Sequence, residues 1–384
     1  MKDELGSISV LIPDGESFYL RTVLHCLSRI KGARIYVLSA KRYTPMRFSR
    51  YIYHYEYHEL SDDTAAWIAL INQRMQEHHI DVLMPIFEEG IRKLVENKQQ
   101  LRFREKTLLA ASTTEFDIAN DKSKLAQHLQ QHQLPVPRSY LLQDKNDNSL
   151  QECHLNYPLL AKPFLVSGGG EGIVPVNNKN ELLEKLESGT VQTPVLLQEQ
   201  LDGHDLGCNV ICKEGEILAF TIQRGFLYNK TPFSPQIGLT MVQDEAVIQS
   251  VRKLMKSLKW TGVANVDLFY DNNSREYKIL EINPRYWNTL LGSLVAGVNF
   301  PLVYCQAVLG KPITENTYMA KDFVNLKGIF ASIGKDYRVI FRPGYLWNHS
   351  PLPYIVKDPL PVAYQFVWRT KNILLRKIKG RKTL

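Results

Sequence analysis

Short apolar runs alternate with amphipathic stretches over the first 115 residues of the chain. The apolar runs predict strands at 9–12, 34–38, 81–86 and 107–111. The amphipathic stretches predict helices at 17–30, 62–79 and 89–100, the second with Ser61 as its N-cap. Strands joined by helices of this length form a parallel sheet covered on both faces, so residues 1–115 are predicted to form an α/β domain. An alternating, tyrosine-rich run at 51–58 is interpreted as a half-exposed edge strand.

Between residues 116 and 310 the pattern changes to hairpin-forming strands with fewer helices. Strands are predicted at 159–162, 173–176, 195–200, 206–213, 216–221, 262–269 and 276–282. Helices are predicted at 121–133 and 244–258, with a further helical pattern at 290–308. This is an α+β unit with a small subdomain at about 120–200 and a larger one at about 201–310. In the C-terminal extension, 311–384, we expect strands within 323–342 and an irregular segment at 343–361, which holds five prolines.

The net charge of +8 comes almost entirely from one end of the sequence. Residues 369–384 hold seven basic residues and no acidic one, which leaves +1 for the rest of the chain. A basic face for nucleic acid spread over the protein is therefore not expected. Two interpretations of the tail stay open: a solvated chain end, and a weak surface anchor for anionic lipid or a partner.

Cysteine usage and hydropathy bear on the compartment. The five cysteines are scattered and odd in number, which favours reduced thiols over a disulfide framework. The sequence has no apolar run of about 18 residues, the length a transmembrane helix needs. The first residues lack the apolar segment of a signal peptide. We therefore expect a cytoplasmic protein.

A lysine and a glycine-rich loop point to phosphate binding. Lys162 ends a predicted strand and precedes Ser167-Gly168-Gly169-Gly170-Glu171-Gly172. Glycines expose backbone N–H groups and allow close approach to a polyphosphate, and the lysine adds positive charge. A flexible hairpin is the alternative interpretation. Lys122, at a helix start, and Arg224, beyond the strand at 216–221, supply further cations.

A polar segment from Gln198 to Asp205 follows an apolar strand. Its backbone groups can meet an adenine edge, and a carboxylate a few residues later can bind ribose hydroxyls. The alternative is an ordinary strand end followed by a turn.

Two carboxylates and an amide are expected on one face of a hairpin. Glu281 and Asn283 are two positions apart on one strand, so their side chains share a face. The loop at 271–274 brings Asp267, on the preceding strand, close to Glu281. Such oxygens suit Mg²⁺ bound to phosphates, and Arg285 just beyond can grip a phosphate.

In their order and spacing these segments resemble the ATP-grasp superfamily, which includes D-alanine–D-alanine ligase, biotin carboxylase and the large subunit of carbamoyl-phosphate synthetase. The resemblance covers about 1–310, and the ending Glu-Ile-Asn-Pro-Arg is most similar to the carbamoyl-phosphate synthetase and biotin carboxylase branch. It implies an N-terminal parallel α/β (pre-ATP-grasp) domain followed by an ATP-grasp fold of two α+β subdomains. The turns at 13–15 and 87–90 would then help form the acceptor side.

The resemblance also implies a role for each candidate residue. Contacts to the α- and β-phosphates fall to Lys122 and Lys162, and the mobile hairpin over the triphosphate comprises Ser167, Gly168, Gly169, Gly170 and Gly172. Nucleotide contacts fall to Gln198 for the adenine amino group, to backbone groups of Glu199 and Leu201, and to Asp205 for ribose. One or two Mg²⁺ ions, with Mn²⁺ as an alternative, would be held by Asp267, Glu281 and Asn283. Catalytic roles in stabilising the transferring phosphate fall to Arg285 and Arg224.

The function that follows is an ATP-dependent ligase, which activates a carboxylate as an acyl-phosphate for attack by an amine or a thiol. Its expected partners are small-molecule carboxylates and amines. Two alternatives stay open: carboxyphosphate chemistry on bicarbonate, and a nucleotide-binding regulator without turnover. Residues 311–384 match nothing in the resemblance, and capping of the acceptor site or homodimer formation are the roles considered for them.

Overall fold

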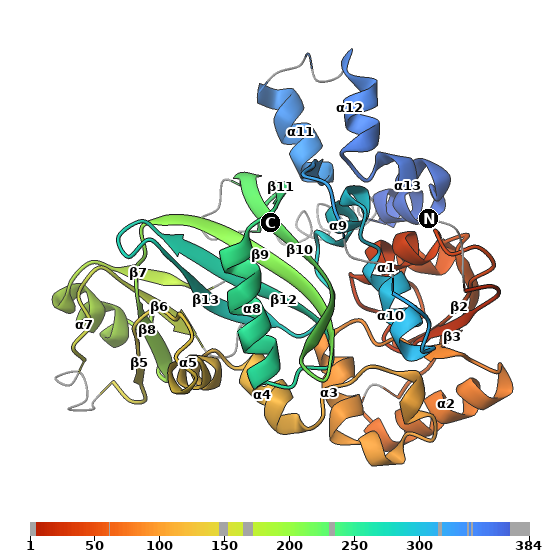
Figure 1. The fold of residues 1–384 in the computed structure, drawn as a ribbon, viewed down its shortest axis with the longest axis horizontal. Helices are drawn as coiled ribbons and strands as arrows, with labels where there is room; N and C mark the ends of the chain where they lie inside the picture. The colour runs from red at the N-terminus through yellow and green to blue at the C-terminus, as the bar shows by residue number, and fades with distance from the viewer. Residues whose placement is uncertain are drawn as a thin grey trace, which may run out of the picture.

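The protein is described by a computed structural model that covers residues 5–60, 62–145, 153–163, 172–229, 235–313, 317–335, 338 and 341–368. Three sheets with the helices that pack on them, and a cluster of C-terminal helices, make up this part of the chain (Figure 1).

The N-terminal sheet is parallel throughout, in the order β3(Ile52–Tyr57)-β2(Arg34–Ser39)-β1(Ser9–Ile12)-β4(Val82–Leu83). Three helices accompany it: α1(Leu20–Leu27), α2(Thr64–Glu77) and α3(Glu88–Glu96). Alternate residues of β1 face opposite sides. Val10 packs with α1, whereas Leu11 packs with α2 and α3. The predicted α/β arrangement and the edge position of the tyrosine-rich strand are confirmed.

Residues 107–111 and the start of α2 differ from the pattern read in the sequence or lie partly outside the described residues. The sequence predicted a strand at 107–111, and this prediction is wrong, because no strand forms there. The segment is buried, but the Leu108 N–H donates to the Tyr304 hydroxyl at 2.8 Å instead of joining a ladder. Ser61 lies outside the described residues, and the Asp63 carboxylate caps α2 by accepting from the Ala66 N–H at 2.9 Å.

A small antiparallel sheet follows, in the order β5(Ser139–Leu142)-β8(Val195–Glu199)-β6(Leu159–Pro163)-β7(Val174–Val176). Helix α7(Lys179–Glu187) packs against it. This sheet has a hydrophobic cluster of its own, separate from the two larger clusters of the protein. It therefore forms a distinct small unit, seen at the left of Figure 1.

The large sheet is antiparallel, in the order β13(Glu276–Asn283)-β12(Gly262–Asp271)-β9(Gly203–Lys213)-β10(Glu216–Leu227)-β11(Gly238–Val242)-β14(Asp322–Val324). Helix α8(Glu245–Ser257) covers one face. Helices α9(Leu290–Ala296) and α10(Phe300–Val308) pack on the other face and also against α1. Two further helices, α4(Thr113–Asn120) and α5(Lys122–Gln131), lead from the first domain into this region. The predicted sequence of α/β and α+β parts is confirmed.

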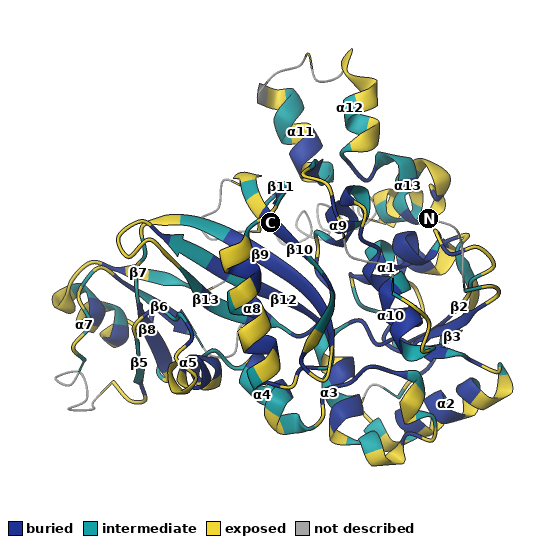
Figure 2. Cartoon of the chain, in the orientation of Figure 1, coloured by how far each residue is buried: buried dark blue, intermediate teal, exposed yellow. Residues whose placement is uncertain are grey.

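Most of the two helices behind the large sheet is buried, as the dark colouring of Figure 2 shows. In the described part of the chain, no single helix is long and apolar enough to cross a membrane. The bent pair α9 and α10 passes that test together, by length and composition only, with a bend of 86°.

The C-terminal extension is mainly helical. Of the strands predicted within 323–342, β14(Asp322–Val324) forms at the start, whereas α11(Leu326–Lys335) takes the place of a further strand and the predicted irregular segment at 343–361 is largely helical. After α11 come α12(Pro343–Asn348), α13(Leu352–Lys357) and helical residues 360–368. Pro343 is the first residue of α12, and Pro353 and Pro361 are second in their helices. Proline is tolerated in the first helical turn, where the missing N–H needs no partner. The prolines therefore mark helix starts here.

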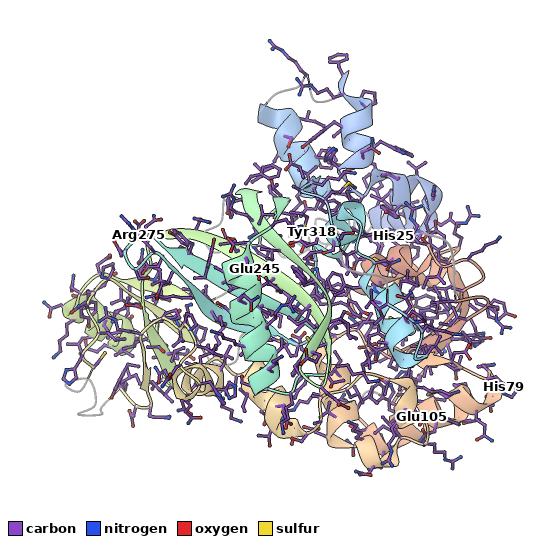
Figure 3. All side chains as sticks on the ribbon, viewed as in Figure 1. His25, His79, Glu105, Glu245, Arg275 and Tyr318 are labelled. Atoms are coloured by element: carbon purple, nitrogen blue, oxygen red, sulfur yellow. The ribbon has the colours of Figure 1, made fainter. Side chains whose placement is uncertain are left out.

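This extension is attached to the N-terminal domain by buried contacts. The Tyr354 ring of α13 stacks on His25 of α1, with centroids 5.3 Å apart; Figure 3 labels His25 beside α13. The Asp358 carboxylate accepts from the Ser49 hydroxyl at 2.5 Å and from the Arg50 N–H at 3.0 Å. Because β14 also completes the large sheet, the extension joins the two larger parts of the protein.

Candidate functional site

Two carboxylates face each other on neighbouring strands of the large sheet. Asp267 of β12 is in register with Glu281 of β13, immediately before a bulge. The Asn283 side-chain N–H donates to Asp267 Oδ2 at 3.1 Å and to Glu281 Oε1 at 3.5 Å. The structure thus brings together the three residues that the sequence placed on one hairpin face.

The two carboxylates differ electrostatically. Desolvation, with the charge of Glu281, holds the pKa of Asp267 well above its usual value. Desolvation raises the pKa of Glu281 too, but the charges of Lys122 and Lys162 and the hydrogen bonds to Lys122 and Asp267 together outweigh it, so the pKa of Glu281 is lowered. Glu281 is therefore the stable anion of the pair, and Asp267 is the carboxylate that most lacks a cation.

Lys122 reaches this pair from the start of α5. The Asp121 carboxylate caps the helix by accepting from the N–H groups of Ser123 and Lys124, at 2.8 and 3.0 Å. The cap fixes the helix start, so the first side chain, Lys122, is directed at the carboxylates. Its Nζ lies 3.2 Å from Glu281 Oε2.

Lys162 faces the same space from the small sheet. It is buried on β6, and its Nζ donates to Gln198 Oε1 of β8 at 2.5 Å. Desolvation lowers the pKa of Lys162 to about 8; the charge of Glu281 raises it and that of Lys122 lowers it further. Two lysines from different elements thus interact with one glutamate between the small and large sheets.

Arg285 connects the carboxylate cluster to the N-terminal domain. Its guanidinium donates to Asn283 Oδ1 at 3.0 Å and pairs with Glu88 Oε2 at 2.5 Å. It also lies over the Tyr19 ring, 4.8 Å from the centroid. Glu88 opens α3 just beyond the end of β4, at one of the turns singled out in the sequence.

The turns at the ends of β1 and β4 are held together by a buried carboxylate. Asp14 accepts from the N–H groups of Ile86 and Phe87, at 2.9 and 2.8 Å. Desolvation raises the pKa of Asp14 to about 7, while the two N–H donors lower it. Gly90 is required beside it, because a Cβ there would lie 2.8 Å from Asp14 Oδ2. The turn that carries Glu88 is thereby fixed.

Sequence reasoning missed a chain of buried polar side chains behind the carboxylates. Asn283 donates to Asn265 at 3.2 Å, Asn265 to Asn209 at 3.1 Å, and Asn209 to Thr221 at 3.1 Å and Gln223 at 3.3 Å. Asn209 and Thr221 have no exposed surface. The available signal was the period of two, which puts Asn265 on the same face as Asp267.

The other candidates have partners of their own in the structure. Gln198 already uses its carbonyl oxygen for Lys162 and would need its second lone pair for an adenine amino group. The Glu199 carboxylate pairs with Lys278 at 2.9 Å and Arg138 at 2.8 Å. Arg224 is exposed on β10, and Leu201 is half-buried.

Asp205 and the glycine-rich segment complete the candidate set. The Asp205 carboxylate accepts from the Tyr228 hydroxyl at 2.5 Å and also from the Gln236 amide. Of the glycine-rich segment, Gly172 is exposed with a φ of 75°. The remaining members, Ser167, Gly168, Gly169 and Gly170, lie outside the described residues.

The donor set fits a hard divalent cation bound together with a ligand. Asp267 and Glu281 supply carboxylate oxygens, and burial beside Glu281 disfavours ionisation of Asp267 unless a positive charge is bound there. In the described ranges no group of three or more His, Cys, Asp and Glu side chains could hold a metal alone. Asn283 presents its amide nitrogen to the carboxylates and its oxygen to Arg285. Coordination through that oxygen requires the amide to turn over.

Comparison with known families agrees with this arrangement. Residues 119–289 match the family model of the ATP-grasp domain. A curated relative, the carbamoyl phosphate synthase large chain of Lachnoclostridium phytofermentans, is 24% identical over 234 residues. The match covers 57% of this chain but only 22% of that relative, so the chain spans about a fifth of the relative's length.

Solved structures share the fold at low sequence identity. The N5-carboxyaminoimidazole synthetase of Staphylococcus aureus superposes with a TM-score of 0.64 at 16% identity, covering 86% of each chain. The L-amino acid ligase of Bacillus licheniformis gives a TM-score of 0.56 at 18% identity, covering 79% of this chain and 74% of that one. The likeness of fold to these structures therefore extends beyond residues 119–289, over 79–86% of this chain.

Proposed function

We propose that the protein is an ATP-dependent ligase that joins a carboxylate to an amine through an acyl-phosphate. The observation that carries this proposal is the convergence of Lys122, Lys162 and Arg285 on Asp267 and Glu281. Three cations and two carboxylates from three parts of the chain suit a triphosphate with a divalent cation. We also propose the boundaries 1–115, 116–310 and 311–384 for the three parts.

In this proposal the nucleotide lies between the small and large sheets. Lys122 and Lys162 contact its phosphates, which replace Glu281 and Gln198 as their partners. The glycine-rich segment 167–172 is assigned the role of covering the triphosphate, and the backbone at Glu199 and Leu201 meets the adenine. Support comes from a relative of the same fold: the S. aureus synthetase has been solved in complex with ADP.

Asp267, Glu281 and Asn283 would hold Mg²⁺, with Mn²⁺ as an alternative. The bound ion supplies charge neutralisation for the transferring phosphate. A structural neighbour, the 2-oxoglutarate carboxylase biotin carboxylase domain of Hydrogenobacter thermophilus, was solved with MgADP. Turning of the Asn283 amide would release Arg285 from it, leaving the guanidinium available for the phosphoryl group or the substrate carboxylate.

The chemistry then proceeds in two balanced steps. A substrate carboxylate oxygen attacks the γ-phosphorus, the bond to the β-phosphate oxygen breaks, and ADP leaves. An amine attacks the acyl carbon, phosphate leaves, and the amine loses a proton. Lysine and arginine act by position and charge, so no covalent enzyme nucleophile is needed.

The direct test is phosphate release from ATP across a panel of amino acids and small carboxylates, with and without amines. Hydroxylamine replaces the amine in a parallel reaction and traps an acyl-phosphate as a hydroxamate. We expect carboxylate-dependent hydroxamate that disappears in Glu281→Gln but not in Glu276→Gln, an exposed control on the same strand. Phosphate release with bicarbonate alone would favour carboxyphosphate chemistry. Nucleotide binding without any phosphate release would refute the ligase.

A further inference from the structure

Exposed large hydrophobic side chains are concentrated in the C-terminal extension. Of the sixteen in the described part of the chain, eight lie between residues 326 and 368. They include Phe330 of α11, Phe341 and Trp347 at α12, and Trp368, with exposed fractions of 73%, 76%, 46% and 53%. Figure 1 places α11, α12 and α13 together at one corner of the molecule. Such a concentration on a water-facing surface indicates a docking face.

These side chains are displayed by a well-anchored scaffold. Val324 of β14 donates to the His349 carbonyl at 2.8 Å, and the Gly328 N–H is capped by Asn325 at 2.9 Å. Ile329, Tyr354 and Asp358 are buried on the inner side. The exposed aromatic residues therefore do not belong to a segment that lacks packing. Their exposure is a property of the outer side of folded helices.

Basic residues are interleaved with these apolar ones. On α11, exposed Lys327 and Phe330 are three positions apart and share a helix face. Exposed Arg342 adjoins Phe341, and exposed Lys357 adjoins Val356. Residues 321–384 contain thirteen basic and three acidic residues, a net charge of +10. With +8 for the whole chain, residues 1–320 carry −2, so the positive charge of the protein belongs to this extension.

We propose that the outer side of the C-terminal extension, which we call the aromatic–basic face, docks on an anionic lipid surface. Aromatic side chains interspersed with lysine and arginine are the composition of interfacial helices, whose rings enter the headgroup region while the cations meet anionic lipids. A second copy of the chain is a less suitable partner for this face. A two-fold contact would bring together residues 321–384 of both copies, each with a net charge of +10, and the like charges would repel.

The tryptophans of the chain make the proposal testable without labels. Three of the five, Trp67, Trp260 and Trp287, are buried, whereas Trp347 and Trp368 are exposed and both lie in the extension. Full-length protein is mixed with phosphatidylcholine vesicles, with or without phosphatidylserine, in which a brominated lipid quenches nearby tryptophans. We expect quenching only with phosphatidylserine, and its loss when salt is raised from about 0.1 M to about 1 M.

Variants separate the contributions. The double variant Phe330→Ser, Phe341→Ser should weaken vesicle binding at least tenfold. Each substitution removes an aromatic ring that would be buried among the lipid headgroups when the protein docks. The matched control, Tyr43→Ser with Tyr53→Ser, removes two similarly exposed aromatic residues from the N-terminal domain and should leave vesicle binding unchanged. Lys327→Gln and Arg342→Gln should each weaken binding about fivefold and flatten the salt dependence.

Trp347→Phe with Trp368→Phe should keep vesicle binding, measured by co-sedimentation, but lose the quenching by brominated lipid. Quenching that persists in this variant would mean that another surface meets the lipid, and would overturn the proposal. Equal binding to neutral vesicles would overturn it as well. A dimer that dissociates in the Phe330→Ser, Phe341→Ser variant, without vesicle binding by the wild type, would assign the face to a second copy instead.

Discussion

The two carboxylates of the candidate site should respond oppositely to the same chemical change. Asp267→Asn and Glu281→Gln each replace an acid by its amide at nearly constant volume. Both should abolish phosphate release, because each removes an anionic ligand for the divalent cation. Their effects on the free energy of unfolding without nucleotide or metal should differ in sign.

The magnitude follows from the partners of each group. At the Lys122–Glu281 distance of 3.2 Å, Coulomb attraction is about 5 kcal/mol for an effective dielectric constant of about 20. The two side chains are 19% and 24% exposed, so screening reduces the loss in Glu281→Gln to about 2–3 kcal/mol. In Asp267→Asn a poorly solvated acid beside Glu281 is removed, and we expect stability to rise by about 1 kcal/mol.

The assay is urea denaturation followed by circular dichroism in the presence of EDTA, alongside phosphate release with nucleotide and Mg²⁺. Glu276→Gln makes the same change at an exposed position of β13 and should leave both measurements unaltered. The reasoning is refuted if Asp267→Asn is destabilised more than Glu281→Gln, or if either retains turnover.

Three further predictions concern groups around this pair. Asn209→Leu should lower the free energy of unfolding by about 2–4 kcal/mol in the same denaturation assay, because it leaves buried polar partners on two other strands unsatisfied; no change would refute the network. ATP affinity measured by calorimetry should fall as pH rises through about 8, where Lys162 loses its proton, and a Lys162→Met variant should show no such fall; the same fall in that variant would refute the assignment. The pKa of Asp14 is raised from 3.8 to about 7, so ionisation is costlier in the folded state. Wild-type stability relative to Asp14→Asn should therefore decline between about pH 4 and pH 7, and a rise over that interval would contradict the burial argument.

What the sequence could supply was local. A short loop at 272–275 joins β12 and β13, so the closeness of Asp267 and Glu281 follows from neighbouring residues alone. Their direct opposition also needs the bulge between Asp267 and Leu268, because the register counted from the loop would pair Asp267 with Leu280. The same holds for Lys122, because the cap that directs it is the preceding residue. The period of two likewise gave the shared face of Glu281 and Asn283.

What the sequence could not supply depends on distant packing. The pairing of Glu88 with Arg285 requires the N-terminal domain to pack against the large sheet. Asn209 joins the site only through the strand order β12-β9-β10. The failed strand at 107–111 has the same origin, because the hydroxyl of Tyr304, almost 200 residues later, takes the place of a ladder partner.

The attachment of the extension to the N-terminal domain also has a consequence for synthesis of the protein. Ser49 and Asp358, which meet in a buried hydrogen bond, are 309 residues apart, and His25 is covered by Tyr354. At roughly 5–20 residues per second, a ribosome needs about 15–60 s to travel between them. During that interval the surface around α1 is exposed on the nascent chain. It becomes buried only when α13 has been synthesised and Tyr354 packs on His25. The N-terminal domain, although made first, is therefore among the last parts to become complete, and this surface is where a chaperone would be expected to bind while translation continues.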